Sequence, residues 1–129
     1  MMGRIVLLSA LLLVAACEPL GMFSGGKLDG TLTRTPQNWS FTDAVKTVQL
    51  ETQPSEPYSV NIWVVAVGSV LYVHAGDNRA TWVEHLEVES NVRLRIEQKL
   101  YELVAMRVED KNEFALFSDV YEKKYDRRP

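Results

Sequence analysis

The chain has 129 residues, a formal net charge of −3, 47% hydrophobic residues, 24% charged residues and a single Cys. This length predicts one domain, and the composition excludes a disordered, collagen-like or disulfide-stapled chain. The acidic balance argues against a nucleic-acid-binding protein, because phosphate recognition needs a clustered basic excess. One Cys forms no internal disulfide and builds no zinc site alone, so no metal is expected.

Residues 1–16 have the pattern of an export signal. Arg4 supplies a positive charge, and Ile5 to Ala16 is apolar apart from Ser9. As a helix this apolar stretch would reach roughly 18 Å, which is short of the ~30 Å hydrocarbon layer of a membrane. The segment is therefore interpreted as a secretory signal and not as a membrane-spanning helix.

The end of this segment, Val14-Ala15-Ala16-Cys17, looks like the lipobox of bacterial lipoproteins. In that motif the Cys is acylated, with palmitate as a typical chain, and becomes the mature N-terminus. Cys17 is thus the predicted lipidation site, and its acyl chains would hold the protein on a membrane. The alternative is an ordinary signal peptide with an incidental Cys. Because Glu18 and not Asp follows the Cys, the expected location is the cell envelope, at the periplasmic face of the outer membrane.

Residues 17–30 are predicted to be the acylated Cys and a flexible tether, since they hold four glycines and little periodicity. A single folded domain is expected over residues 31–129.

The first half of this domain predicts strands. Residues 47–52 alternate polar and apolar, as a half-buried strand does. Residues 60–67 are apolar on both faces, which is typical of a central strand covered on both sides. Gly68-Ser69 predicts a two-residue hairpin turn, and residues 70–75 the returning strand.

The second half adds helices and another hairpin. A short helix is expected over residues 79–87, and residues 92–97 alternate as a strand that residues 100–109 follow in the opposite direction. Asp110 and Glu113 resemble a capping box for an amphipathic C-terminal helix. The prediction is a mainly β fold: a small closed or split β-barrel of five to six antiparallel strands, with one short helix between hairpins and a C-terminal amphipathic helix.

The order hairpin, short helix, hairpin and C-terminal helix also carries a family resemblance, which extends from residue 58 to residue 125. The segments involved are Val60–Val65, Leu71–Val73, Trp82–Leu86, Asn91–Ile96 and Tyr101–Asp110, with Tyr121 and Tyr125 near the end. In pattern and order they resemble the FMN-binding split-barrel proteins related to pyridoxamine phosphate oxidase. The likeness is stronger to their deazaflavin-dependent nitroreductase and quinone-reductase relatives.

This resemblance implies a homodimer with FMN or a deazaflavin bound at the subunit interface. In such proteins the end of the second hairpin strand and the start of the next helix hold the cofactor phosphate. The matching residues here are His74, Arg79 and Thr81, while Trp63, Tyr72 and Trp82 are the candidates that flank the ring.

Two functions follow as hypotheses. The first is an oxidoreductase in which the cofactor passes hydride to a nitro or quinone acceptor, with no catalytic residue identified. The second is a non-catalytic ligand- or partner-binding lipoprotein whose barrel has lost the cofactor. The latter is favoured by the weak phosphate cluster, which holds only Arg79 as a cation and includes the opposing Asp77.

Three further pairs of residues are expected to have structural roles. His74 and His85 are interpreted as surface or hydrogen-bonded residues, with metal or haem ligation as the alternative. Trp39 and Phe41 are expected to be core aromatics. Arg93 and Arg95 lie on the polar side of their strand and are expected on the barrel exterior, with an anion contact across a dimer interface as the alternative.

Overall fold

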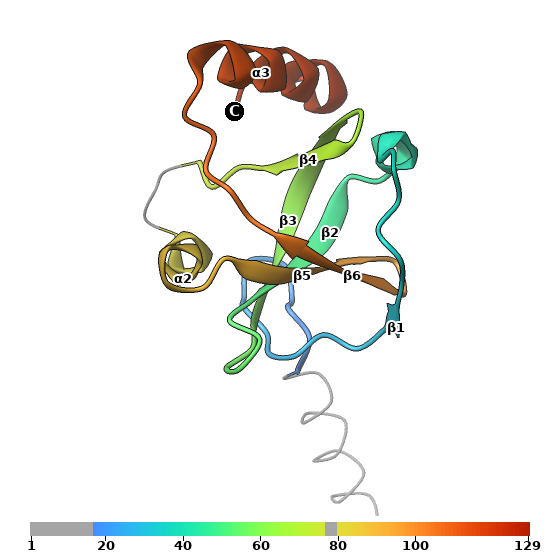
Figure 1. Ribbon diagram of the computed structural model, residues 1–129, viewed down its shortest axis with the longest axis vertical. Coiled ribbons are helices and arrows are strands. Elements are labelled where there is room, and N and C mark those ends of the chain that lie inside the picture. The colour runs from blue at the N-terminus through green and yellow to red at the C-terminus, as the bar shows by residue number, and fades with distance from the viewer. Residues whose placement is uncertain (1–16, 77–79) are drawn as a thin grey trace, which may run out of the picture.

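Six strands form one curled sheet, a half-barrel with two α-helices beside it (Figure 1). The computed structural model describes residues 17–76 and 80–129. The elements are β1 (Thr31–Leu32), the 3₁₀ helix η1 (Ser40–Ala44), β2 (Thr47–Thr52), β3 (Tyr58–Val67), β4 (Val70–Val73), α2 (Thr81–Val88), β5 (Asn91–Ile96), β6 (Lys99–Val104) and α3 (Lys111–Tyr125). The strand order is β1-β6-β5-β2-β3-β4. The predicted mainly β fold with flanking helices is confirmed.

The longest strand, β3, changes partner along its length. Its first part pairs antiparallel with β2, as far as Trp63 opposite Thr47. From Val64 onward it pairs with β4, across a turn at which Gly68 has a φ of 59°. The predicted hairpin is thus confirmed, and glycine suits the turn because it adopts a positive φ without steric cost. Pairing is antiparallel between β2, β3, β4, β5 and β6, whereas the two-residue β1 runs parallel to β6.

The inner face of the curled sheet carries the main core. Trp39 lies there at 2% exposure, with its ring edge against Tyr101 at 5.1 Å between centroids. The other buried members are Val48, Leu50, Ile62, Val64, Val92, Leu94 and Ile96. Trp39 is therefore a core aromatic, as predicted. The same prediction is wrong for Phe41, which lies on η1, is 48% exposed, and has its ring centroid 6.0 Å from that of Trp39.

A second, smaller core lies on the outer face of the β3–β4 hairpin, where α3 packs (Figure 1). Here Val65 meets Phe117 and Tyr121. The helix begins as predicted: the Asp110 carboxylate accepts hydrogen bonds from the amides of Asn112 and Glu113, at 2.7 and 3.1 Å. Apolar residues spaced three and four apart put Phe117 and Tyr121 on one side of the helix.

The predicted second strand of the last hairpin is too long. It was expected over residues 100–109, but β6 ends at Val104, which lies opposite Asn91, the first residue of β5. Beyond that point a longer β6 would have no partner strand, and the Ala105 amide instead donates to the Ser90 carbonyl at 2.8 Å.

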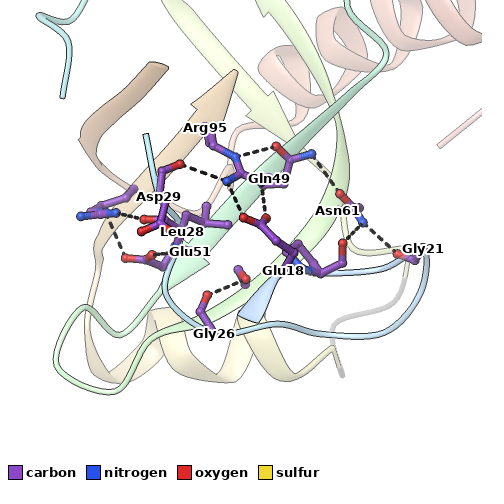
Figure 2. A network of polar contacts seen from close by, with 12 residues as sticks. Glu18, Gly21, Gly26, Leu28, Asp29, Gln49, Glu51, Asn61 and Arg95 are labelled. Atoms are coloured by element: carbon purple, nitrogen blue, oxygen red, sulfur yellow. Dashed lines mark hydrogen bonds and ion pairs between the residues drawn. The ribbon is translucent and has the colours of Figure 1, made fainter. Parts of the chain in front are cut away.

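Residues 18–30 do not form the flexible tether that the glycines suggested. Leu28 is completely buried, and Gly25 exchanges backbone hydrogen bonds with Ser59 at 2.8 and 2.9 Å. The segment lies against β2, β3 and β5, whose outer side carries a row of polar and charged side chains (Figure 2). The ordered domain thus includes residues before 31, because this polar row binds the segment's backbone.

Candidate functional site

The residues predicted to hold a cofactor fall on two sides of the sheet. Trp63 and Tyr72 lie on the outer face under α3, and His74 follows β4 on the same side. Trp82, from α2, packs against the inner core instead. Thr81 is the exposed first residue of α2, and Arg79 lies outside the described residues. The structure therefore brings three of the six predicted residues together and separates Trp82 from them.

The three residues on the outer face make their ring contacts within this chain. Trp63 is stacked on Tyr125, with 4.4 Å between ring centroids and 10° between planes, and the Arg127 guanidinium lies 5.7 Å from the Trp63 ring centre. Tyr72 packs on Phe117 at 5.6 Å, and its hydroxyl donates to the Glu113 carboxylate at 2.8 Å. Trp63 remains 36% exposed, but the ring face that stacks on Tyr125 is not open to a second planar ring.

The surroundings of Tyr72 and His74 shift the pKa of each side chain in the direction that favours its neutral form. Burial raises the pKa of Tyr72, and the nearby Glu113 carboxylate raises it further. Burial lowers the pKa of His74, whose ring lies between Phe117 and Tyr121 at 5.8 and 6.1 Å. Its Nδ1 accepts from the Gly76 amide at 3.2 Å, which fits the neutral ring. His74 is thus an aromatic packing residue with a local hydrogen bond.

Within one chain, the candidates for flanking a cofactor ring do not share one face of the sheet. The ring-flanking candidates Trp63 and Tyr72 are separated by the sheet from Trp82 and from the start of α2. The residue before α2, Ala80, has no side chain that caps the helix. His85, on the same helix, is bonded to Thr52 at 2.7 Å and packs edge-on against Tyr58.

Sequence reasoning missed the attachment of α3 to the sheet. Val64 is the first β3 residue beyond the reach of β2, and its carbonyl accepts from Lys124 Nζ and from the Tyr125 hydroxyl, both at 2.7 Å. Lys124 also donates to the Thr42 carbonyl at 2.8 Å. Burial lowers the pKa of Lys124, and the Asp43 carboxylate opposes that change. These side chains therefore bond to β3 where it extends past Thr47, the first residue of β2, and has no partner strand on that side.

A second set of missed contacts holds residues 18–30 to the outer face (Figure 2). Arg95 makes a two-pronged ion pair with Glu18, at 2.6 and 3.1 Å, and also donates to the Asp29 carbonyl and to Gln49. This arginine lowers the pKa of Glu18 chiefly through its hydrogen bonds. Gln49 donates in turn to Asn61 at 3.0 Å. Arg95 is on the outer face, as expected, but its anion partner in the structure is Glu18 of the same chain.

The neighbouring ion pair is more deeply buried. Glu51 is 1% exposed; its Oε2 accepts from the Leu28 amide at 2.6 Å, and its Oε1 lies 3.1 Å from Arg93 Nε. That second contact is an ion pair without the alignment of a hydrogen bond. Arg93 Nη2 donates to the Leu28 carbonyl at 2.6 Å. The pair thus binds both backbone groups of Leu28. Strict alternation in residues 47–52 could not reveal it, because Glu51 lies on the side expected to face water.

Neither a membrane span nor a metal cluster is found in residues 17–76 and 80–129. No helix in these ranges is long and apolar enough to cross a membrane. No three His, Cys, Asp or Glu side chains in the same ranges are grouped to hold a metal ion.

No family model, no curated protein and no solved structure matches this chain.

Proposed function

We propose that this protein is a lipid-anchored module of the bacterial cell envelope that binds a partner or small ligand without flavin chemistry. The observation that carries the proposal is the stacking of Trp63 on Tyr125 at 4.4 Å. Since Tyr72 also packs under α3, two of the three aromatic rings expected to bind a cofactor pack against the protein's own C-terminal helix.

The anchor in this proposal is Cys17, the last residue of the lipobox-like sequence. Cys17 is exposed, at the start of the described chain. Acyl chains on this residue would hold the half-barrel at a membrane surface. The periplasmic face of the outer membrane remains the proposed location, on the basis of Glu18.

The proposed binding surface is an apolar patch formed by Val88, Val104 and Met106. These side chains are 81%, 64% and 87% exposed. The hydrogen bond from Ala105 to Ser90 brings the end of α2, the start of β5 and the end of β6 together at this place. Grouped exposed apolar side chains commonly mark interaction surfaces. The patch is therefore also our candidate surface for the predicted homodimer.

A flavin titration tests the main proposal. The mature, acylated protein in nonionic detergent is titrated with FMN and separately with a deazaflavin cofactor, and the ring fluorescence is followed. The proposal predicts no saturable binding by protein that is folded by circular dichroism. Saturable micromolar binding that Trp63→Leu abolishes would contradict it and favour the oxidoreductase.

The apolar patch has its own test. Met106→Glu is expected to weaken self-association or partner binding, measured by light scattering and by pull-down from solubilised envelopes. Leu116→Glu is the matched control, because Leu116 is an exposed residue, at 49%, on α3. Equal effects of the two substitutions would contradict a role for the patch.

A further inference from the structure

The loop formed by residues 18–26, called here the anchor loop, carries a tight turn with unusually exposed apolar side chains. Met22 is 100% exposed, Phe23 80% and Leu20 57%. The backbones of Leu20 and Phe23 exchange two hydrogen bonds, at 3.0 and 2.8 Å, across Gly21 and Met22. Gly21 has a φ of 57°, which permits this closure. The turn is thus a formed structure that presents three apolar side chains to the surroundings.

The turn is fixed to the sheet and cannot fold its side chains away without breaking polar contacts. The Asn61 amide on β3 donates to the carbonyls of Pro19 and Gly21, at 3.1 and 3.3 Å (Figure 2). Just before the turn, Glu18 is held by Arg95. These contacts, at Glu18 and Pro19 before the turn and at Gly21 within it, determine the direction in which the turn points.

Close packing between the two arms of the anchor loop adds to this rigidity. The Gly26 amide donates to the Cys17 carbonyl at 3.0 Å. A Cβ atom on Gly25 would lie 2.5 Å from the backbone nitrogen of Pro19, so only glycine fits there without a shift. The arms are consequently in backbone contact directly beside the predicted lipidation site.

The position of the turn beside Cys17 indicates which partner its apolar side chains would contact. Residues 1–16, which are apolar from Ile5 to Ala16 apart from Ser9, join the described chain at Cys17. Figure 1 shows that the start of the described chain lies at the opposite end of the molecule from α3. The exposed turn begins only three residues after Cys17, so whatever binds the N-terminus to a membrane also brings the turn to the membrane surface.

We propose that Leu20, Met22 and Phe23 insert into the interface of the lipid bilayer that carries the anchor. Apolar side chains at such a depth add to the hold of an acyl chain and limit the tilt of the domain. The half-barrel then stands on the anchor loop, with α3 directed away from the membrane. This inference rests on the proposed lipidation of Cys17.

The test measures the environment of the turn in the acylated protein. Met22→Cys provides one reactive thiol for a nitrobenzoxadiazole label, because an acylated Cys17 has no thiol left. Asp119→Cys, on an exposed position of α3, provides the control label. Each protein is reconstituted into vesicles of phosphatidylcholine and phosphatidylglycerol, with and without spin labels on the acyl chains. Intact mass spectrometry reports the acylation of Cys17 independently.

The expected result is a shift of emission to shorter wavelength for the label at position 22, together with quenching several-fold stronger than at position 119. Phe23→Ser should reduce the shift, whereas Phe114→Ser, an exposed residue of α3, should leave it unchanged. A label at position 22 that is as water-exposed as the one at position 119, in protein of acylated mass, overturns the insertion alone. A mass without acyl chains overturns the lipoprotein proposal and the insertion together.

Discussion

Removal of the Glu51 charge is the sharpest test of the contacts that hold residues 18–30 to the sheet. Glu51→Gln keeps the size of the side chain and one carbonyl acceptor for the Leu28 amide, but it leaves Arg93 without its anion. The Arg93 side chain is 21% exposed and that of Glu51 2% exposed. A buried pair that loses one partner is destabilised by about 3–5 kcal/mol, and partial access of water to Arg93 reduces this to about 2–3 kcal/mol.

The matched control is the surface pair in the same chain. Glu122 lies 3.4 Å from Arg128, and their side chains are 45% and 75% exposed. Glu122→Gln should therefore cost about 0.5 kcal/mol or less. Urea unfolding of the mature chain in nonionic detergent, followed by tryptophan fluorescence, measures both variants.

The coupling between the two buried residues can be measured as well. The double variant Glu51→Leu with Arg93→Met should lose less stability than the sum of its two single substitutions, because neither charge is left unpaired. Ordinary surface substitutions change the free energy of unfolding by about 0.5 kcal/mol or less. If Glu51→Gln changes it by no more than this, the ion pair does not hold the segment on the sheet.

Three other predictions concern the rest of the fold. Lys124→Met should destabilise the protein by about 1–3 kcal/mol, because it removes a charged donor from the carbonyls of Val64 on β3 and Thr42 on η1. The exposed Lys123→Met should change the stability little, and equal urea midpoints for the two variants would contradict this. Burial lowers the pKa of His74, so its contribution to stability is complete above pH 6.5 and is lost as the pH falls toward the folded pKa. Between pH 7.5 and pH 5.5, the melting temperature of His74→Phe should therefore fall less than that of the wild type. Equal decreases would refute the burial of a neutral His74. Gly25→Ala should expose the anchor loop to proteolysis, while Gly26→Ala, whose Cβ would have no heavy atom closer than 4.0 Å, should not; cleavage at the same rate would show that close packing is unimportant.

Much of the fold could be predicted because local patterns and tertiary structure agree. Residues 47–52 alternate and form β2, Gly68 makes the hairpin turn, and Asp110 caps α3 with its carboxylate. The other half of the expected capping box did not follow, since the Glu113 carboxylate accepts from Tyr72. When a side chain has two available partners, the tertiary structure determines which one it binds, and a local sequence motif contains no information about tertiary structure.

The site residues were harder to predict because successive side chains along a strand point to opposite faces of the sheet. Trp63 and Tyr72 share the outer face with Val65, whereas Ile62 and Val64 face the inner core beside Trp82. A family likeness based on pattern and order placed Trp63 and Trp82 around one ring without testing which face each occupies. Likewise, glycines suggested a tether in residues 17–30, while the charges that bind this segment lie on strands far along the chain, at Glu51 and Arg95.

The central claim is that this half-barrel is held on a membrane through Cys17, with the anchor loop against the lipid. The most direct measurement is the intact mass of the full chain after expression in a Gram-negative host and extraction from its membranes. The account predicts a chain that begins at Cys17 and carries the added mass of a diacylglyceryl group. A chain that retains residues 1–16, or one cleaved elsewhere without added acyl mass, would contradict it.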